Sequence, residues 1–330
     1  MGQRSPARAA WKTVGAGLLL AICLSASSIA QQVFPERPIS LVVAFPPGAS
    51  TDSVARVLGE AMSRSLGQPV VVDNRPGAGG TTGAAFVARA KPDGYTLLVA
   101  VNATLTMNPF VQRSYPFDPL ISLTPVSLAA RSALALAVNA SLPVTSVDEL
   151  VRYARARPGA LSYGSAGLGT GHHVAGEMIK KRAGVDMVHI PYKGSNEAIQ
   201  ALVAGQIQVS FGSLPAVMAH AAAGAIRILA VTEERRVDDL PNVPTVAESI
   251  PGVVVSTWVG LYAPAGTPAA VVERLHAAVH QALQRADVAQ KLSGMGLTVV
   301  DAGPAELLAR TRAEYEGWSK AFPELGIRAE

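Results

Sequence analysis

The sequence predicts an α/β protein of two lobes, and three observations support this prediction. Short apolar, β-branched runs alternate with segments of helical period, which is the pattern of βαβ units. The runs are continuously apolar, which indicates strands buried on both faces in parallel or mixed sheets. The final helical segments return to the first lobe. Two crossover strands therefore join the lobes, an arrangement that suits hinge closure around a ligand.

The first lobe is expected over residues 31–129 and 260–330. Strands and helices alternate along its first part. Strands are expected at 39–44, 69–73, 95–101 and 126–130, and helices at 51–66, 82–90, 268–285 and 304–322.

The second lobe is expected over residues 130–259 and repeats the same alternation. The apolar stretch 252–261 is expected to lead the chain back to the first lobe. Strands are expected at 134–138, 161–163, 187–190, 207–211 and 226–231, and helices at 146–156, 171–183, 195–204 and just after Pro215.

The first 30 residues predict a secretory signal peptide. Three basic side chains precede an apolar run at 14–24, and small residues follow up to Ala30. The run is shorter than the roughly 20 residues that a membrane-spanning helix needs, so we expect cleavage after Ala30 and a mature protein in the periplasm. Cys23 raises a lipoprotein alternative, which we discount because Ile22 precedes it where a lipoprotein signal has a small residue.

Removal of this leader changes both the charge and the chemistry of the chain. The leader contains three of the 28 Lys and Arg residues and no acid, so the mature chain has 25 basic against 24 acidic residues. Because its net charge is then close to zero, nucleic acid is not an expected partner. Cys23, the single cysteine, is lost as well, so thiolate metal sites and cysteine nucleophiles are excluded from the mature chain.

Two loops, one in each lobe, occupy the position where open α/β sheets bind ligands. Residues 45–52 follow the first strand, and residues 165–173 join a strand to a helix in the second lobe. Both loops combine glycine and hydroxyl side chains with a helix N-terminus, and neither contains Lys or Arg. This combination favours a carboxylate held by backbone amides and hydroxyls, although helix caps and turns use the same residue types.

Other candidate sites are weaker. His276 and His280 stand four apart on an expected helix, but no carboxylate completes a zinc motif. At most one of His172 and His173 can face the cleft, because neighbouring helical residues diverge by about 100°. Residues 74–80 resemble a phosphate cradle but lack the P-loop ending, and we interpret them as a tight strand-to-helix connection.

Three further residues have two interpretations each. Tyr192 and Lys193 follow an expected strand, where they can face the cleft or form a solvated turn. Trp258 lies near the second crossover, and we expect it in the core rather than in the wall of the cleft.

Short motifs recur along nearly all of the mature length. They are 35–39, 45–48 with 50–52, VVDNRPGAGG at 71–80, KPDGYTLL at 91–98, 169–170, VHIPYKG at 188–194, 230–232, VPTVAE at 243–248 and APAGTP at 263–268. Together they resemble the substrate-binding proteins of tripartite tricarboxylate transporters, the Bug family. The resemblance implies a Venus-flytrap fold of the type II periplasmic kind that binds a carboxylate between its lobes. It also implies delivery to transporter membrane subunits, and we expect a monomer with no cofactor and no bound metal.

The resemblance also implies which residues bind the ligand. Four of them lie in the first loop and four in the second loop. One more follows the third strand, and the last two stand where the family often has an Asp-Asn pair. They are Phe45, Ser50, Thr51 and Asp52; Ser165, Ala166, Gly169 and Thr170; Thr104; and Gly212 with Ser213.

Three positions depart from the family pattern. Ala49 stands where glycine is frequent, Leu168 where a polar residue is frequent, and Gly212-Ser213 in place of the Asp-Asn pair. The last two changes reduce the polarity of the distal pocket. They predict an aromatic or weakly polar monocarboxylate rather than a tricarboxylate.

Two alternative functions remain at this point. An enzyme acting on a carboxylate has the same architecture, although the sequence contains no G-x-S-x-G elbow, H-E-x-x-H pair or nucleotide motif. A ligand-binding module for a sensor kinase of a two-component system also fits the same sequence.

Overall fold

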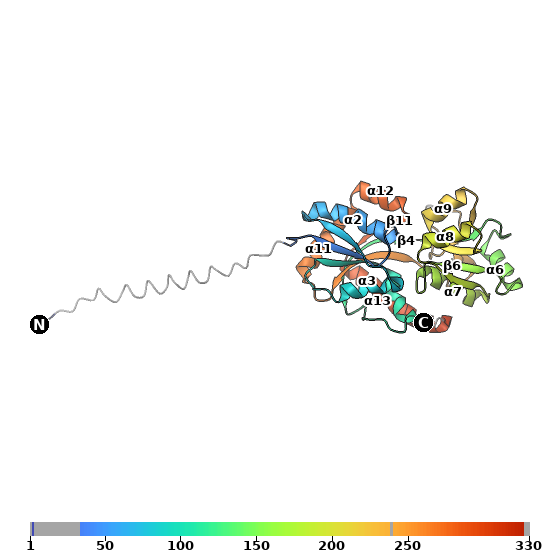
Figure 1. Cartoon of the computed structure of the whole chain (residues 1–330), viewed down its shortest axis with the longest axis horizontal. Coiled ribbons are helices and arrows are strands. Elements are labelled where there is room, and N and C mark those ends of the chain that lie inside the picture. Colours follow the sequence, from blue (N-terminus) through green and yellow to red (C-terminus); the bar gives the residue numbers. More distant parts are fainter. Residues whose placement is uncertain (1, 3–33, 238–239, 327–330) are drawn as a thin grey trace. The chain divides into compact units, whose positions relative to one another are not determined.

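The computed structural model describes residue 2, residues 34–237 and residues 240–326 (Figure 1). The predicted leader and Cys23 lie outside these residues. All the elements discussed below lie in the unit Arg37–Glu330. Within the described part, no helix combines the length and apolar character needed to cross a bilayer.

The first sheet has six strands in the order β11-β4-β10-β3-β1-β2. β1 pairs in parallel with β2 and β3, whereas β10 is antiparallel to β3 and β4, and β11 is antiparallel to β4. The sheet is therefore mixed, as predicted. The strands are β1 (Ile39–Val43), β2 (Val70–Asn74), β3 (Thr96–Val101), β4 (Leu123–Ser132), β10 (Thr257–Pro264) and β11 (Leu297–Ala302).

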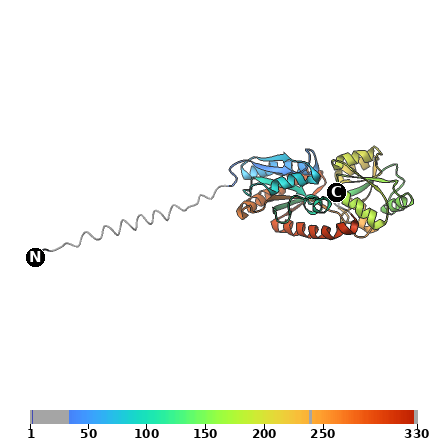
Figure 2. The same cartoon turned by 60° about the horizontal axis from the view of Figure 1, so that its bottom comes forward.

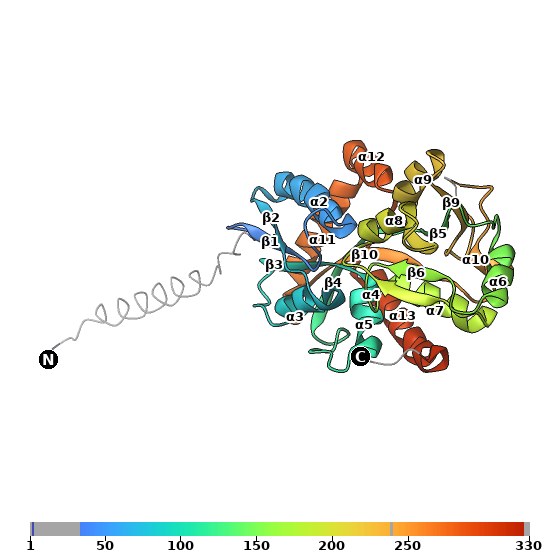
Figure 3. The same cartoon turned by 45° about the vertical axis from the view of Figure 1, so that its right-hand side comes forward.

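Helices cover both faces of this sheet, which explains why its central strands are apolar on both sides. α2 (Ser50–Leu66) buries the stripe Val54, Leu58 and Met62, and it ends where Gly67 adopts a left-handed φ of 70°. Figure 3 shows α2 (Ser50–Leu66), α11 (Ala269–Leu283) and α12 (Ala286–Gly294) on one face, and α3 (Thr81–Ala88) and α13 (Pro304–Leu325) on the other.

The second sheet has five strands in the order β7-β6-β8-β5-β9. β6 is parallel to β7 and β8, and β5 is antiparallel to β8 and β9. The strands are β5 (Leu134–Asn139), β6 (Ser162–Ser165), β7 (Val188–Pro191), β8 (Val209–Ser213) and β9 (Ile226–Val231). α8 (Ser195–Val203) and α9 (Leu214–Ala222) cover one face, and α6 (Val147–Ala156), α7 (Gly171–Ala183) and α10 (Val246–Ser249) cover the other (Figure 3).

Of the apolar stretch 252–261, residues 257–261 belong to β10, and Val253 and Val255 are buried outside any strand. Several elements differ from the sequence prediction. The helix expected at 268–285 ends at Leu283, and Arg285 is extended before α12 begins. β11 and short helical segments were not predicted: η2 (Ala78–Gly80), α4 (Asn102–Thr106), α5 (Asn108–Val111), α10 and α12.

The two sheets are linked by two strand crossovers, and α13 packs against the cores of both. Ala133 alone separates β4 from β5, and residues 232–256 lead from β9 to β10. Figure 2 shows the course of α13, which places Leu307 in the core of the first sheet and Phe322 in the core of the second. The two-lobed fold with two crossovers is as predicted, while the limits 31–129 with 260–330 and 130–259 for the lobes stay a prediction.

Candidate functional site

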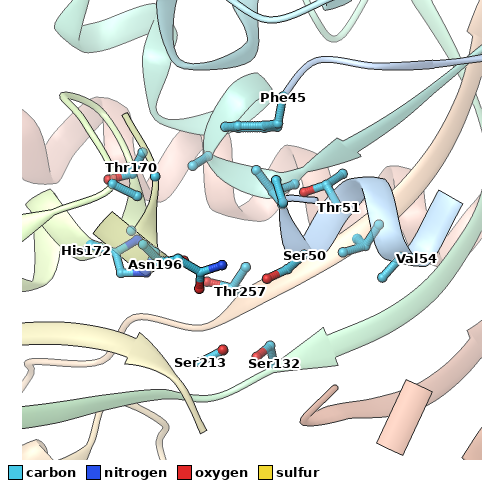
Figure 4. A pocket seen from close by; sticks show the side chains of 18 of the residues that line it. Phe45, Ser50, Thr51, Val54, Ser132, Thr170, His172, Asn196, Ser213 and Thr257 are labelled. Carbon is cyan, nitrogen blue, oxygen red and sulfur yellow. The ribbon is translucent and has the colours of Figure 1, made fainter. Parts of the chain in front are cut away.

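A cavity of about 450 Å³ lies between elements of the first and the second sheet. This volume is within the range of small-molecule binding sites. Figure 4 shows side chains that line it, among them Phe45 and Ser50 from the first loop and Thr170 and His172 from the second.

Three helix N-termini meet at this cavity. Ser50 and Thr51 begin α2, Gly171 begins α7, and Ser195 begins α8, and all four residues line the cavity. The first N–H groups of a helix lack partners within the helix and carry partial positive charge. The residues that precede α2 and α8, Ala49 and Gly194, form no side-chain cap, so these first-turn N–H groups stay available for an anion.

The two crossovers contribute hydroxyl groups to the same cavity. Ser132 of β4 pairs with Thr257 of β10, and both line it. Ser213 lines it from the end of β8 (Figure 4). Between these polar groups lie apolar side chains such as Val54 and Leu134, so the cavity offers isolated hydrogen-bonding groups on an apolar wall.

Charged groups are few in the lining that the structure describes. They are Lys193 and Glu197, which lie together at the start of α8, where the Lys193 backbone N–H donates to Glu197 Oε2 at 3.2 Å. No arginine is among the described lining residues. The cavity therefore offers helix N-termini and hydroxyls to an anion.

The structure brings six of the eleven predicted ligand-binding residues to this cavity. They come from both loops and from the end of β8. The six are Phe45, Ser50, Thr51, Ala166, Thr170 and Ser213. Their contact with a ligand remains a prediction.

Asp52 is directed into the fold and supports the first loop. Its carboxylate accepts hydrogen bonds from the Gly48 backbone N–H (2.9 Å), Arg56 Nε (2.9 Å) and Asn74 Nδ2 (2.8 Å). Burial raises the pKa of Asp52, but these hydrogen bonds and the charge of Arg56 outweigh burial and hold the pKa below its ordinary value. Asp52 is thus ionised and shapes the loop that carries Ser50 and Thr51.

Thr104 and Gly169 lie outside the described lining. Thr104 is fully buried and donates to the Gly79 carbonyl oxygen at 3.3 Å. A Cβ at Gly169 would lie 2.4 Å from Asn108 Oδ1, so α5 approaches the second loop where only glycine fits.

Ser165 and Gly212 also lie outside the described lining and support the fold around it. Ser165 is buried, and its hydroxyl is hydrogen-bonded to His189 Nε2 at 2.7 Å and to the Gly167 carbonyl oxygen at 3.2 Å. A Cβ at Gly212 would lie 2.9 Å from Ile199, so this glycine permits α8 to pack closely on β8.

Several lining residues were not among the predicted ligand contacts. Ser195 and Asn196 at the start of α8 follow Gly194, and this glycine-polar sequence after a strand is the signal by which they were identifiable. Ser132 and Thr257 carried no such signal, because their place in the cavity depends on the pairing of β4 with β10.

The two neighbouring histidines point in different directions. His172 lines the cavity, whereas His173 stacks on His189 with ring centroids 4.4 Å apart. Thr170 caps this end of α7: its Oγ1 donates to the Gly167 carbonyl oxygen at 2.7 Å and accepts from the His173 backbone N–H at 3.5 Å.

A second cavity of about 580 Å³ adjoins the first and shares Phe45, Ala166 and Lys193 with it. Leu168 and Tyr192 line this second space, and Leu168 is 41% exposed. Residues 74–80 form the expected strand-to-helix connection, and Gly79 from it borders both cavities.

The other residues singled out from the sequence have structural roles. His276 Nδ1 is hydrogen-bonded to Ser127 Oγ at 2.6 Å, and His280 Nδ1 to Asp301 Oδ2 at 2.8 Å. In the described part, no group of three His, Cys, Asp or Glu residues is placed to hold a metal ion. Trp258 is fully buried in the first core, as predicted.

Comparison with known proteins places this chain in a family. Residues 54–319 match the family described as "Tripartite tricarboxylate transporter family receptor". The chain is 36% identical over 314 residues to protein BugT of Bordetella pertussis, which covers 94% of this chain and 96% of the relative.

Two solved structures share the fold. A protein of R. palustris, Rpa4515 with adipate, superposes with a TM-score of 0.84 at 36% identity, covering 90% of this chain and all of that chain. MatC from Rhodopseudomonas palustris with bound malate superposes with a TM-score of 0.81 at 32% identity, covering 87% of this chain and 99% of that chain. The match thus extends over nearly the whole length, and the chain belongs to the tripartite tricarboxylate transporter receptor family.

Proposed function

We propose that this chain is a periplasmic solute-binding protein that captures a small carboxylate in the 450 Å³ cavity and does not transform it. The observation that carries the proposal is the convergence of the N-termini of α2, α7 and α8 on one cavity, together with hydroxyls from Ser50 and Ser213. Such a site neutralises one carboxylate through N–H and O–H donors. The family assignment and the acids bound by two structural neighbours, adipate and malate, support it.

Transport is the role that we assign to this binding. The family is a receptor family for tripartite tricarboxylate transporters, so membrane subunits of such a transporter are the proposed partners. Export follows from the leader-like residues 1–30, with cleavage after Ala30. A receptor must release its cargo unchanged, and incubation of the protein with each acid it binds should therefore yield no product by chromatography.

The distal end of the ligand is proposed to be weakly polar. Leu168 lines the adjoining cavity, and Ser213 brings only a hydroxyl to the main cavity. An aromatic or weakly polar monocarboxylate satisfies the donors at one end and contacts apolar surface at the other.

A thermal-shift screen of carboxylic acids tests the proposed function, followed by calorimetry on the acids that raise the melting temperature. We expect benzoate-like monocarboxylates to bind more tightly than citrate, and each acid to bind more tightly than its uncharged amide. Binding of the amide as tightly as the acid contradicts the carboxylate site. Tight citrate binding without binding of aromatic acids contradicts only the weakly polar distal pocket.

A matched variant tests the assignment of Leu168. Leu168→Asn should lower the affinity for benzoate relative to malate by about tenfold, because it replaces apolar contact by an amide. Val188 is a suitable control, because it is exposed on β7 and lies outside the linings of both cavities. Val188→Asn should leave the affinity ratio unchanged, and an equal effect of both variants removes Leu168 from the distal pocket.

A further inference from the structure

His172 is a half-buried polar side chain of the cavity wall that has no part in the carboxylate site so far. It is the second residue of α7 and lines the cavity beside Thr170 and Gly171 (Figure 4). Both of its ring nitrogens are shielded from solvent, and neither has a hydrogen-bond partner in the described part of the chain. Native proteins rarely leave such groups unpaired, so this imidazole requires an explanation.

A carboxylate in the cavity provides the missing partner. A neutral imidazole has one N–H donor and one acceptor nitrogen, and a protonated ring has two donors. A carboxylate accepts hydrogen bonds only, so it matches the donor of His172 together with the first-turn N–H groups of α7. The charged side chains that share the cavity lining are Lys193 and Glu197, at the start of α8.

The protonation state of His172 depends on whether an anion is present. Burial alone lowers the pKa of His172 to about 4, so the imidazole of the empty cavity is neutral at physiological pH. His173 does not share this environment, because it stacks on His189 and its Nδ1 accepts from the Gly169 backbone N–H at 3.3 Å. A carboxylate placed against the His172 ring stabilises the imidazolium form.

We propose that His172 donates a hydrogen bond from its ring to the bound carboxylate and takes up a proton from solvent as the ligand enters. The bound state then pairs an imidazolium with a carboxylate. Affinity consequently increases as the pH falls toward the value at which free His172 becomes protonated. This inference rests on the proposed function, because it needs a carboxylate in this cavity.

Calorimetry with benzoate and with adipate, at pH 6 and pH 8, tests the inference. Titrations in two buffers of different ionisation enthalpy report the number of protons taken up. For the unaltered protein we expect net proton uptake and an affinity that rises by up to about tenfold for each unit of falling pH. His172→Gln should remove the proton uptake and weaken binding at pH 6 by about 10- to 100-fold.

His220→Gln is the matched control, because His220 lies on α9 outside the linings of both cavities. It should retain proton uptake and affinity. If benzoate and adipate bind without proton uptake, or if His172→Gln behaves like the unaltered protein, the inference is overturned while the carboxylate-binding function stands. If no acid in the screen binds, both the proposed function and this inference are overturned. The number of protons that the unaltered protein takes up on binding tests the inference even where His172→Gln does not fold.

Discussion

The side-chain amide of Asn74, at the end of β2, donates a hydrogen bond to Oδ1 of Asp52 in the first turn of α2 at 2.8 Å. The other carboxylate oxygen of Asp52 accepts from the Gly48 backbone N–H at 2.9 Å. The strand, the loop and the helix are thus held by one carboxylate, and the positions of the cavity-lining residues Ser50 and Thr51 depend on it.

Asp52→Ala should therefore destabilise the protein. It leaves the Gly48 N–H without its acceptor and the Asn74 amide with only the Phe45 carbonyl oxygen. We expect a loss of about 2 to 4 kcal/mol in the free energy of unfolding. Urea denaturation followed by circular dichroism measures this change.

Asp73→Ala is the control for Asp52→Ala. Asp73 forms an ion pair with Arg75 in which the acid is 38% and the arginine 41% exposed, so its loss should change the stability by less than about 1 kcal/mol. A loss of equal size in both variants would show that Asp52 does not organise the loop.

Ser50→Ala should weaken carboxylate binding and leave folding intact. Ser50 is exposed, lines the cavity and begins α2, so the variant removes one hydroxyl donor at the proposed site. We expect a decrease in affinity of about 3- to 15-fold by calorimetry, the effect of one hydrogen bond. Ser53, one turn further along α2, lies outside the described lining, and Ser53→Ala should bind normally.

Gly169→Ala should disturb the second loop more than the strain of its left-handed backbone angle alone would. Gly169 has a φ of 73°, and an added Cβ would meet Asn108 Oδ1 at 2.4 Å and Val111 Cγ2 at 2.6 Å. The variant must move α5 or the second loop, and we expect carboxylate affinity to fall at least about tenfold because the loop also carries Thr170.

Gly67→Ala separates backbone strain from crowding. Gly67 has a φ of 70°, and no atom lies within 4 Å of the position of an added Cβ. The variant should cost about 1 kcal/mol of stability and leave affinity unchanged. Equal affinities for the two variants would show that contact between α5 and the second loop is not needed for binding.

The free energy of unfolding should fall as the pH decreases from about 6.5 toward 4. Burial, followed by the neighbouring charges of His173 and Lys180, lowers the pKa of His189 to about 4 from its ordinary value of 6.5, although Glu177 opposes this change. Between these values the unfolded chain binds a proton that the folded chain does not, so acid favours unfolding.

Urea denaturation across this pH range measures the effect of His189. Each buried neutral histidine contributes a slope of up to about 1.4 kcal/mol per pH unit. His189→Gln should reduce the slope, whereas His220→Gln on α9 should not. An unchanged slope in His189→Gln would show that this ring does not limit stability in acid.

Much of the fold was predictable from the sequence, because most strands and helices have local signals. The run that became β1 is continuously apolar, and Gly67 marks the end of α2 where a left-handed residue was needed. The short α4 and α5 had no such signal. Their apolar side chains, Ala103 and Val111 among them, belong to the core of the second sheet, whose other residues are far away in sequence.

The candidate site was likewise predictable only in part. The sequence by itself determined that two glycine-and-hydroxyl loops follow strands and begin helices, and that they contain no Lys or Arg. It determined the chemistry offered to a carboxylate, since residue types and helix starts are local properties. It did not separate the loop residues that face the cavity from those that support it.

Only the tertiary structure decided which side chains share the cavity. It turned Asp52 inward to Asn74, placed Ser132 beside Thr257 through the pairing of β4 with β10, and left His172 in the cavity wall while His173 stacks on His189. The physical reason is that burial and hydrogen bonding depend on neighbours brought together by sheet register and helix packing. The direction of a polar side chain follows from those neighbours, and the local sequence does not contain them.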